Sequence, residues 1–148
     1  PHDLMIVGRK DGLITADRAV LDRVESFGSR VVFTGYVSDT ALKQIVAQAD
    51  ALDLPSLYEG FGLPPVEAMA VGCPALVSTA ASLPEVCQDA ALYCDPLDVA
   101  DIAAQLKRLV TDQALRQRLR ERGAARARAL NWQACAAGYQ TAIQGLLG

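Results

Sequence analysis

The chain has little of the chemistry that marks metal sites and disulfide-rich proteins. It carries one histidine, His2, and four cysteines with no CxxC spacing, Cys73, Cys87, Cys94 and Cys135. This pattern predicts neither a zinc site nor a disulfide framework, and it favours buried, reduced thiols. His2 lies at the end of the chain, where we expect solvent exposure rather than a catalytic or metal-binding role.

Long apolar runs and strong charge are also missing. No apolar run approaches the ~20 residues that a membrane-spanning helix needs, and the N-terminal segment PHDLMIVGRK lacks the order of a signal peptide. The net charge of -3 gives no electrostatic reason to expect a nucleic-acid partner. We expect a cytoplasmic protein, and a peripheral association of the full enzyme with the inner face of the membrane stays open.

The 148 residues are rich in apolar side chains, at 51%, which is enough for one globular domain over residues 1–148. Short apolar runs alternate with helical periodicity through the first two thirds of the chain. We expect strands at 4–8, 30–35, 49–55, 74–78 and 91–94, helices at 15–28, 38–49 and 65–71, and a helical turn at 83–87. This alternation predicts an α/β fold with a Rossmann-like parallel sheet and flanking helices.

From Asp98 onward the sequence loses its strand signal and becomes rich in alanine, leucine and arginine. Residues 98–148 therefore form a helical C-terminal part of the same domain, with three helices that begin at Asp98, Asp112 and Asn131. Gly123 is expected to loosen the second of these helices. Six arginines of that helix are spread around its circumference, which favours a solvated face over a nucleic-acid arm: Arg116, Arg118, Arg120, Arg122, Arg126 and Arg128.

The segment SLYEGFGLPPVEAM, residues 56–69, carries the clearest functional signal. It follows a predicted strand and enters a helix expected to begin near Pro65, and ligands of open parallel sheets collect where such loops lie. The prolines hold the preceding residues extended, so the amides of Gly60, Phe61, Gly62 and Leu63 are predicted to be free. Free amides at a helix N-terminus favour a phosphate or a polarised sugar oxygen.

Two carboxylates, Glu59 and Glu67, flank these amides. Glu67 is expected in the first turn of the helix, where it can accept hydrogen bonds from a vicinal diol such as a ribose, and Glu59 can accept from a second ring. A molecule with a sugar at each end and phosphate between them suits this arrangement. A purely structural role for these residues, or a general acid/base pair, stays open from the spacing alone.

The segment PSLYEGFGLPPVEAMAVGCPALVSTAASLPEV resembles the donor-binding segment of retaining glycosyltransferases of the glycosyltransferase-B fold, group 1 family. The similarity continues upstream through VVFTGYVSDTALKQIVAQADA and downstream through AALYCDPLDVADIAAQLKRLVTD, so it covers nearly the whole chain. It implies a carboxy-terminal donor-binding domain for a UDP- or GDP-hexose, with no metal and no cofactor. Transfer with retention to a polysaccharide, lipid or small acceptor is the implied reaction.

The resemblance also implies roles for single residues. Glu67 is assigned to the ribose hydroxyls, and Glu59 to the transferred hexose as the catalytic residue. The amides of Gly60, Phe61, Gly62 and Leu63 are assigned to hexose hydroxyls or the distal phosphate. The nucleotide base is assigned to the loop of Gly35, Tyr36 and Val37.

The sequence departs from the family pattern at its start. The first strand, loop and helix of the domain, with the loop cations that hold the diphosphate, have no counterpart, and we interpret Arg9 and Lys10 as solvated loop cations. The N-terminal acceptor domain has no counterpart either, so we expect the fragment alone to transfer little sugar. Two other functions stay open: a nucleotide-sugar epimerase of the 2-epimerase type, and a non-catalytic nucleotide-binding module.

Overall fold

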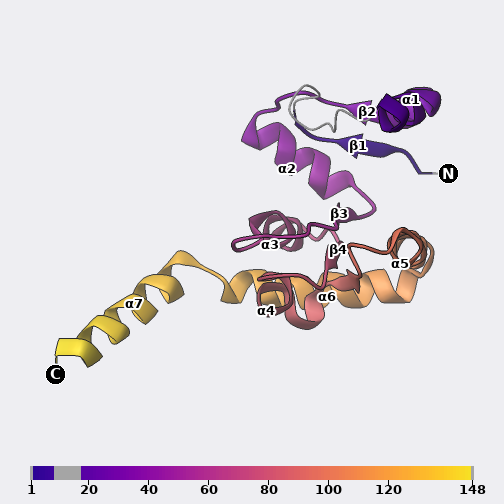
Figure 1. Cartoon of the computed structure of the whole chain (residues 1–148). Helices are drawn as coiled ribbons and strands as arrows, with labels where there is room; N and C mark the ends of the chain where they lie inside the picture. Colours follow the sequence, from indigo (N-terminus) through magenta and orange to yellow (C-terminus); the bar gives the residue numbers. More distant parts are fainter. Residues whose placement is uncertain (1, 9–17, 148) are drawn as a thin grey trace. The chain divides into compact units, whose positions relative to one another are not determined.

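The structure is a computed structural model that describes residues 2–8 and 18–147. The chain forms two compact units, Pro1–Gln44 and Ile45–Gly148, each described here by itself (Figure 1). Within the described residues no helix is long and apolar enough to cross a membrane. Strands and helices alternate in both units, and the strand pairs formed by the described residues are parallel, which confirms the predicted α/β class.

The first unit is built on two short parallel strands. β1 (Leu4–Ile6) pairs with β2 (Val31–Phe33), and Met5 lies opposite Val32. The helix α1 (Arg18–Ser26) and the 3-10 turn η2 (Gly28–Arg30) precede β2. The helix α2 (Asp39–Gln48) follows β2 and continues past Gln44, where this unit ends. The predicted start at Ser38 is confirmed because its Oγ accepts a hydrogen bond from the amide of Ala41 at 3.3 Å. Thr15, the expected start of α1, lies outside the described residues.

The second unit has a three-stranded parallel sheet in the order β3-β4-β5. Its elements are β3 (Leu52–Leu54), α3 (Leu63–Ala70), β4 (Ala75–Ser78), α4 (Leu83–Cys87), η3 (Gln88–Ala90), β5 (Leu92–Cys94), α5 (Val99–Thr111), α6 (Gln113–Ala129) and α7 (Trp132–Leu147). Asp98, Asp112 and Asn131 each accept a hydrogen bond from an amide two or three residues later, which confirms all three predicted helix starts.

The central strand β4 is inaccessible to solvent and separates two apolar clusters. Val77 faces a cluster that α3, α4 and the end of α6 cover, whereas Leu76 faces a cluster that α5 and the start of α6 cover. Alternation along one strand places neighbouring residues on opposite faces of a sheet. Helices therefore cover both faces, which explains why the predicted strand PALVS reads as a continuous apolar run.

The start of α3 corrects one prediction. The helix begins at Leu63 rather than near Pro65, so Pro64 and Pro65 occupy its first turn. Amides of a first helical turn have no partner inside the helix, so two prolines fit there without loss of a hydrogen bond. As a consequence Glu67 is the fifth residue of α3, and the expected first-turn position of its carboxylate is wrong.

The arginines of α6 correct a second prediction, because several of them are bonded to the protein rather than solvated. Arg126 donates to the carbonyl of Val86 at 2.7 Å and to that of Glu85 at 3.1 Å, where α6 passes alongside α4 (Figure 1). Arg120 donates to the carbonyl of Gly72 at 3.2 Å, just beyond α3. Guanidinium donors thus satisfy carbonyls at the ends of two helices, which amides inside those helices cannot reach.

Gly123 also differs from expectation. The helix α6 continues through it, and a Cβ built on Gly123 would lie 3.0 Å from Cγ of Met69 in α3. Glycine at this position therefore permits close contact between α6 and α3 rather than loosening the helix.

Three of the cysteines are buried and free, as predicted, whereas Cys135 is exposed on α7, which corrects the prediction for that residue. Burial raises the pKa of the Cys73 and Cys87 thiols to about 11 and raises the pKa of Cys94. These thiols pack as small apolar groups.

Candidate functional site

The segment of residues 55–62 connects the carboxyl end of β3 to the N-terminus of α3. Because β3 and β4 are parallel neighbours, their carboxyl ends meet at one edge of the sheet. The loop after β3 and the turn of residues 79–82 after β4 therefore share that edge. This is the edge at which open α/β sheets bind ligands.

The backbone of the loop offers a row of donors. The amides of Gly60, Phe61, Gly62 and Leu63 make no hydrogen bond within residues 2–8 and 18–147. Two of these residues, Phe61 and Leu63, have side chains that are about half exposed, at 46% and 55%. The predicted free amides are therefore present at the entrance of α3, where the helix dipole adds positive potential.

Gly62 is the last residue of the loop and sets the angle at which the chain enters α3. It precedes α3 with φ 91° and ψ 53°, in the left-handed region that favours glycine. A Cβ on Gly62 would lie 2.6 Å from Cδ2 of Leu83, a fully buried core residue of α4. Both the backbone conformation and the contact with α4 therefore require glycine here.

Glu59 is half-buried and its carboxylate is held by the protein. Its Oε1 accepts a hydrogen bond from Oγ of Ser56 at 2.8 Å, and its backbone carbonyl accepts one from Oγ of Ser82 at 2.9 Å. The second carboxylate oxygen has no partner among the described residues. Glu59 thus keeps one oriented acceptor for a ligand.

Glu67 is exposed on α3, and its side chain makes no hydrogen bond or ion pair within the described part of the chain. It lies four residues after Leu63, so the two share one exposed face of the helix. Neither carboxylate is turned into the core or neutralised by an arginine. Both acceptors predicted from the sequence remain accessible to a ligand.

The predicted base loop belongs to the first unit and follows β2. Gly35 has φ 68°, and its carbonyl accepts hydrogen bonds from the amide of Gly8 at 3.1 Å and from Oγ1 of Thr34 at 2.9 Å. The next residue, Tyr36, is 86% exposed, and Val37 is half-buried. The turn is thus fixed by the carbonyl of its glycine. Arg9 and Lys10 lie outside the described residues.

Three serines beside the loop were not identified from the sequence. Ser78 ends β4, Ser82 precedes α4, and Ser56 lies in the loop itself. The only available signal was a polar residue at the end of an apolar strand, PALVS, and Ser78 is indeed fully buried. The partners of Ser78 and Ser82 lie 22 and 23 residues away in sequence, so no local pattern shows these two contacts. The partner of Ser56 lies three residues away, at Glu59.

Asp53 was also missed. It lies in β3, and its Oδ1 is buried without a hydrogen-bond partner among the described residues. Burial raises the pKa of this carboxyl above its ordinary value. The aspartate costs stability at neutral pH, because a buried carboxylate without a partner is poorly solvated.

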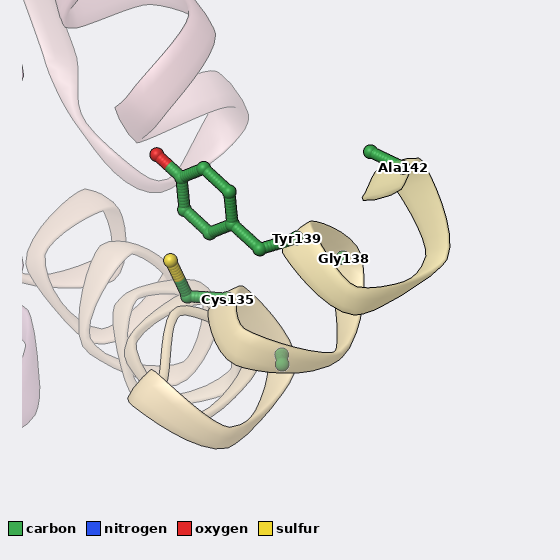
Figure 2. A pocket seen from close by; sticks show the side chains of 5 residues that line it. Cys135, Gly138, Tyr139 and Ala142 are labelled. Carbon is green, nitrogen blue, oxygen red and sulfur yellow. The ribbon is translucent and has the colours of Figure 1, made fainter. Parts of the chain in front are cut away.

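A shallow hollow on α7 lacks the charged and hydrogen-bonding groups of the loop after β3. All five residues that line it come from one helix, α7, and Figure 2 shows the Tyr139 ring and the Cys135 thiol on the same side of that helix. None of the lining residues carries a charge: Ala134, Cys135, Gly138, Tyr139 and Ala142. No group of three or more acidic, histidine or cysteine side chains that could hold a metal ion occurs in the part of the chain that the structure describes.

Comparison with known proteins decides the family. The model of the family described as "Glycosyl transferases group 1" matches residues 4–126, a span that contains both glutamates, the amide row and the Gly35 turn. The chain belongs to the group 1 glycosyltransferases. The resemblance inferred from the sequence is thereby confirmed.

Relatives of this glycosyltransferase chain are enzymes of sugar transfer. An O-antigen chain mannosyltransferase B of Escherichia coli is 43% identical over 103 residues, which cover 70% of this chain and 27% of the relative. The matched region thus spans little more than a quarter of that relative's length.

Solved structures show the same fold. A sucrose-phosphate synthase from Thermosynechococcus elongatus superposes with a TM-score of 0.78 at 30% identity, covering 98% of this chain and 38% of that chain. Anabaena HepE, crystallised with UDP and glucose, superposes with a TM-score of 0.76 at 20% identity, covering 96% of this chain and 40% of that chain. The group 1 chain therefore has the architecture of one half of a glycosyltransferase-B fold.

Proposed function

We propose that this group 1 chain binds a nucleotide-diphosphate hexose, UDP- or GDP-linked, and forms the donor-binding part of a longer transferase. The observation that carries the proposal is the row of unbonded amides at residues 60–63 between two accessible carboxylates. Amides donate to phosphate and hydroxyl oxygens, whereas carboxylates accept from hydroxyl groups. A sugar nucleotide presents both kinds of group within one molecule. The UDP and glucose bound by HepE, a protein of the same fold, support this choice of ligand class.

Each residue of the site is proposed to bind a different group of the sugar nucleotide. Glu67 accepts from the ribose hydroxyls and Glu59 from the transferred hexose, and the amides of residues 60–63 donate to the distal phosphate and hexose hydroxyls. Gly35, Tyr36 and Val37 hold the base through their backbone. No metal is needed in this scheme, because amides and the N-terminus of α3 supply the positive potential that a diphosphate requires.

The reaction is proposed to be hexose transfer with retention, assisted by an acceptor-binding domain elsewhere in the longer protein. This rests on the relatives, which are several times longer than the region they share with this chain. Positioning of the donor and stabilisation of the leaving diphosphate are the contributions expected from the residues described above. The fragment alone is proposed to bind donor and to transfer little.

Calorimetry on the 148-residue chain tests the binding proposal. The Glu67→Ala variant is expected to bind UDP, GDP and their sugars about three- to tenfold more weakly, as loss of hydrogen bonds to one carboxylate implies. Its free energy of unfolding should stay within about 0.5 kcal/mol of the wild type, because the side chain is exposed and unbonded. Glu25→Ala is the matched control: Glu25 is an exposed glutamate of α1 whose side chain has no hydrogen bond or ion pair among the described residues, so neither quantity should change. Equal affinities for the Glu67→Ala variant and the wild type would refute the ribose role.

Activity of the longer protein tests the reaction. Product analysis by proton NMR should show an α-glycoside from an α-linked donor. A β-glycoside would refute retention, and release of an epimerised free sugar nucleotide would identify an epimerase instead.

A further inference from the structure

The donor loop is held by three serine hydroxyls that come from three different segments. Oγ of Ser78, at the end of β4, donates to the carbonyl of Ser56 at 2.5 Å. Oγ of Ser56 donates to the Glu59 carboxylate at 2.8 Å, and Oγ of Ser82 donates to the Glu59 carbonyl at 2.9 Å. Each hydroxyl has one proton, so each serine commits its donor to the stretch from Ser56 to Glu59.

Ser78 links this stretch to the core. It is fully buried on the central strand, and its Oγ also accepts from the amide of Ala80 at 3.3 Å. A buried hydroxyl with both a donated and an accepted bond has little freedom to rotate. The carbonyl of Ser56 is therefore fixed relative to β4.

The bond from Ser82 orients an amide as well as a carbonyl. In a trans peptide the carbonyl and the following N–H point in opposite directions, and no cis peptide occurs among the described residues. Because the Glu59 carbonyl points to Ser82, the Gly60 amide points away from Ser82. One hydroxyl thus fixes the direction of the first amide in the unbonded row.

The bond from Ser56 orients the carboxylate. It occupies Oε1 of Glu59 and leaves the other oxygen as the acceptor for a ligand hydroxyl. A carboxylate held in one rotamer loses less entropy when it binds a sugar than one that must first be ordered.

From these contacts we infer that Ser56, Ser78 and Ser82 are positioning residues for the hexose of the donor, acting through Glu59 and the Gly60 amide. The inference rests on the proposed function, because it requires that Glu59 meets the hexose. Within the amide row we assign the Gly60 amide, which lies next to Glu59, to a hexose hydroxyl rather than to the distal phosphate. The serines should then govern the affinity gained from the sugar and leave the affinity for the nucleotide alone unchanged.

Calorimetry with UDP, UDP-glucose, GDP and GDP-mannose on the 148-residue chain provides the test. The quantity measured is the sugar gain, the dissociation constant of the nucleotide divided by that of its sugar. Ser56→Ala and Ser82→Ala should each lower this gain about three- to tenfold, which is the loss of one positioned hydrogen bond. The affinity for UDP or GDP should change less than twofold.

Matched variants separate positioning from general destabilisation. Ser56→Thr and Ser82→Thr keep the hydroxyl and should restore most of the sugar gain. Ser29→Ala, an exposed serine of the first unit with no hydrogen bond from its hydroxyl among the described residues, should leave it unchanged. In a Glu59→Ala background, Ser56→Ala should have no further effect on the sugar gain, because the carboxylate that Ser56 orients is absent.

The outcomes distinguish this inference from the proposed function. If the wild-type chain binds none of the four ligands, the proposed function fails and the inference fails with it. If Glu59→Gln lowers the sugar gain while Ser56→Ala and Ser82→Ala do not, the function stands and the inference is wrong. Equal losses for nucleotide and sugar nucleotide would show that the serines only maintain the fold, which also overturns the inference.

Discussion

Replacement of Gly62 by alanine tests the geometry on which the amide row depends. The substitution adds one methyl group and meets two obstacles. The backbone has φ 91°, a conformation that costs an L-residue about 1–2 kcal/mol. The new Cβ would also lie 2.6 Å from Cδ2 of Leu83.

The contact with Leu83 cannot be relieved freely. Leu83 is fully buried and belongs to the apolar cluster beneath α3 and α4, so its side chain must leave its rotamer or α4 must shift. Overpacking in a closed core costs about 1–3 kcal/mol. The two effects together predict that Gly62→Ala lowers the free energy of unfolding by about 2–5 kcal/mol.

Alanine substitutions at two other glycines of the same unit separate the backbone contribution to this destabilisation from the contribution of the contact with Leu83. Gly72 has φ 79° with open space around its built Cβ, so Gly72→Ala should lose only the backbone part, about 1–2 kcal/mol. Gly60 has open space and a φ outside the left-handed region, so Gly60→Ala should change stability by less than about 0.5 kcal/mol.

Urea denaturation of the three variants, followed by circular dichroism, measures these differences. The expected order of destabilisation is Gly62→Ala, then Gly72→Ala, then Gly60→Ala. A Gly62→Ala variant as stable as Gly60→Ala would show that the loop does not enter α3 through a left-handed residue packed on α4. The described arrangement of the amides would then be wrong.

Three further predictions concern the second unit. Arg126→Ala should lower the free energy of unfolding by about 1.5–3 kcal/mol because two carbonyls of α4 lose a charged donor, whereas the exposed Arg128→Ala should stay within about 0.5 kcal/mol, both measured in urea. Asp53→Asn should stabilise the chain at pH 7 more than at pH 4.5. Because the folded-state pKa of Asp53 is raised, the wild type loses stability as the pH rises above the ordinary value of 3.8, by at most about 1.4 kcal/mol per pH unit. The same difference in unfolding free energy between variant and wild type at both pH values would contradict this. Iodoacetamide at pH 8 should modify Cys135 quickly in the native chain and Cys87 only in urea, as mass spectrometry of peptides can show, because burial raises the Cys87 pKa to about 11.

Local patterns predicted the elements of the second unit closely. Asp98, Asp112 and Asn131 were identified as helix starts because the bonds that make them so join residues two or three positions apart. The strand PALVS and the turn LPEVC were placed within one residue for the same reason of local signal. The free amides were predicted, but the extended backbone expected before each proline is wrong: Leu63 and Pro64 are helical, and the amides are unbonded because they lie in the loop and at the first residue of α3.

What the sequence could not show depends on tertiary contacts. Arg126 resembles any surface arginine of an amphipathic helix until α4 is placed beside it, and its carbonyl partners lie 40 and 41 residues away. The hydroxyl of Ser82 reaches Glu59 across 23 residues. The predicted start of α3 was wrong for a local reason. A residue before proline is biased against helical geometry, but proline fits well in the first turn of a helix, and here the second effect is the stronger one.

The arrangement of donors and acceptors in the loop is consistent with its proposed role in binding the sugar nucleotide. The carbonyls of Ser56 and Glu59 accept hydrogen bonds from serine hydroxyls, whereas the amides of residues 60–63 make no hydrogen bond among the described residues. Exposed amides cost little in the free chain because water satisfies them. The bonds to the carbonyls of Ser56 and Glu59 hold these two carbonyls away from a ligand. We therefore expect the loop to act as a donor surface for phosphate and sugar oxygens, with Glu59 and Glu67 as the proposed acceptors for sugar hydroxyls. If backbone amides bind the phosphates and the glutamates bind the hydroxyl groups, replacement of Glu59 or Glu67 by alanine should weaken binding of ligands that carry sugar hydroxyls. The affinity for inorganic pyrophosphate should stay the same.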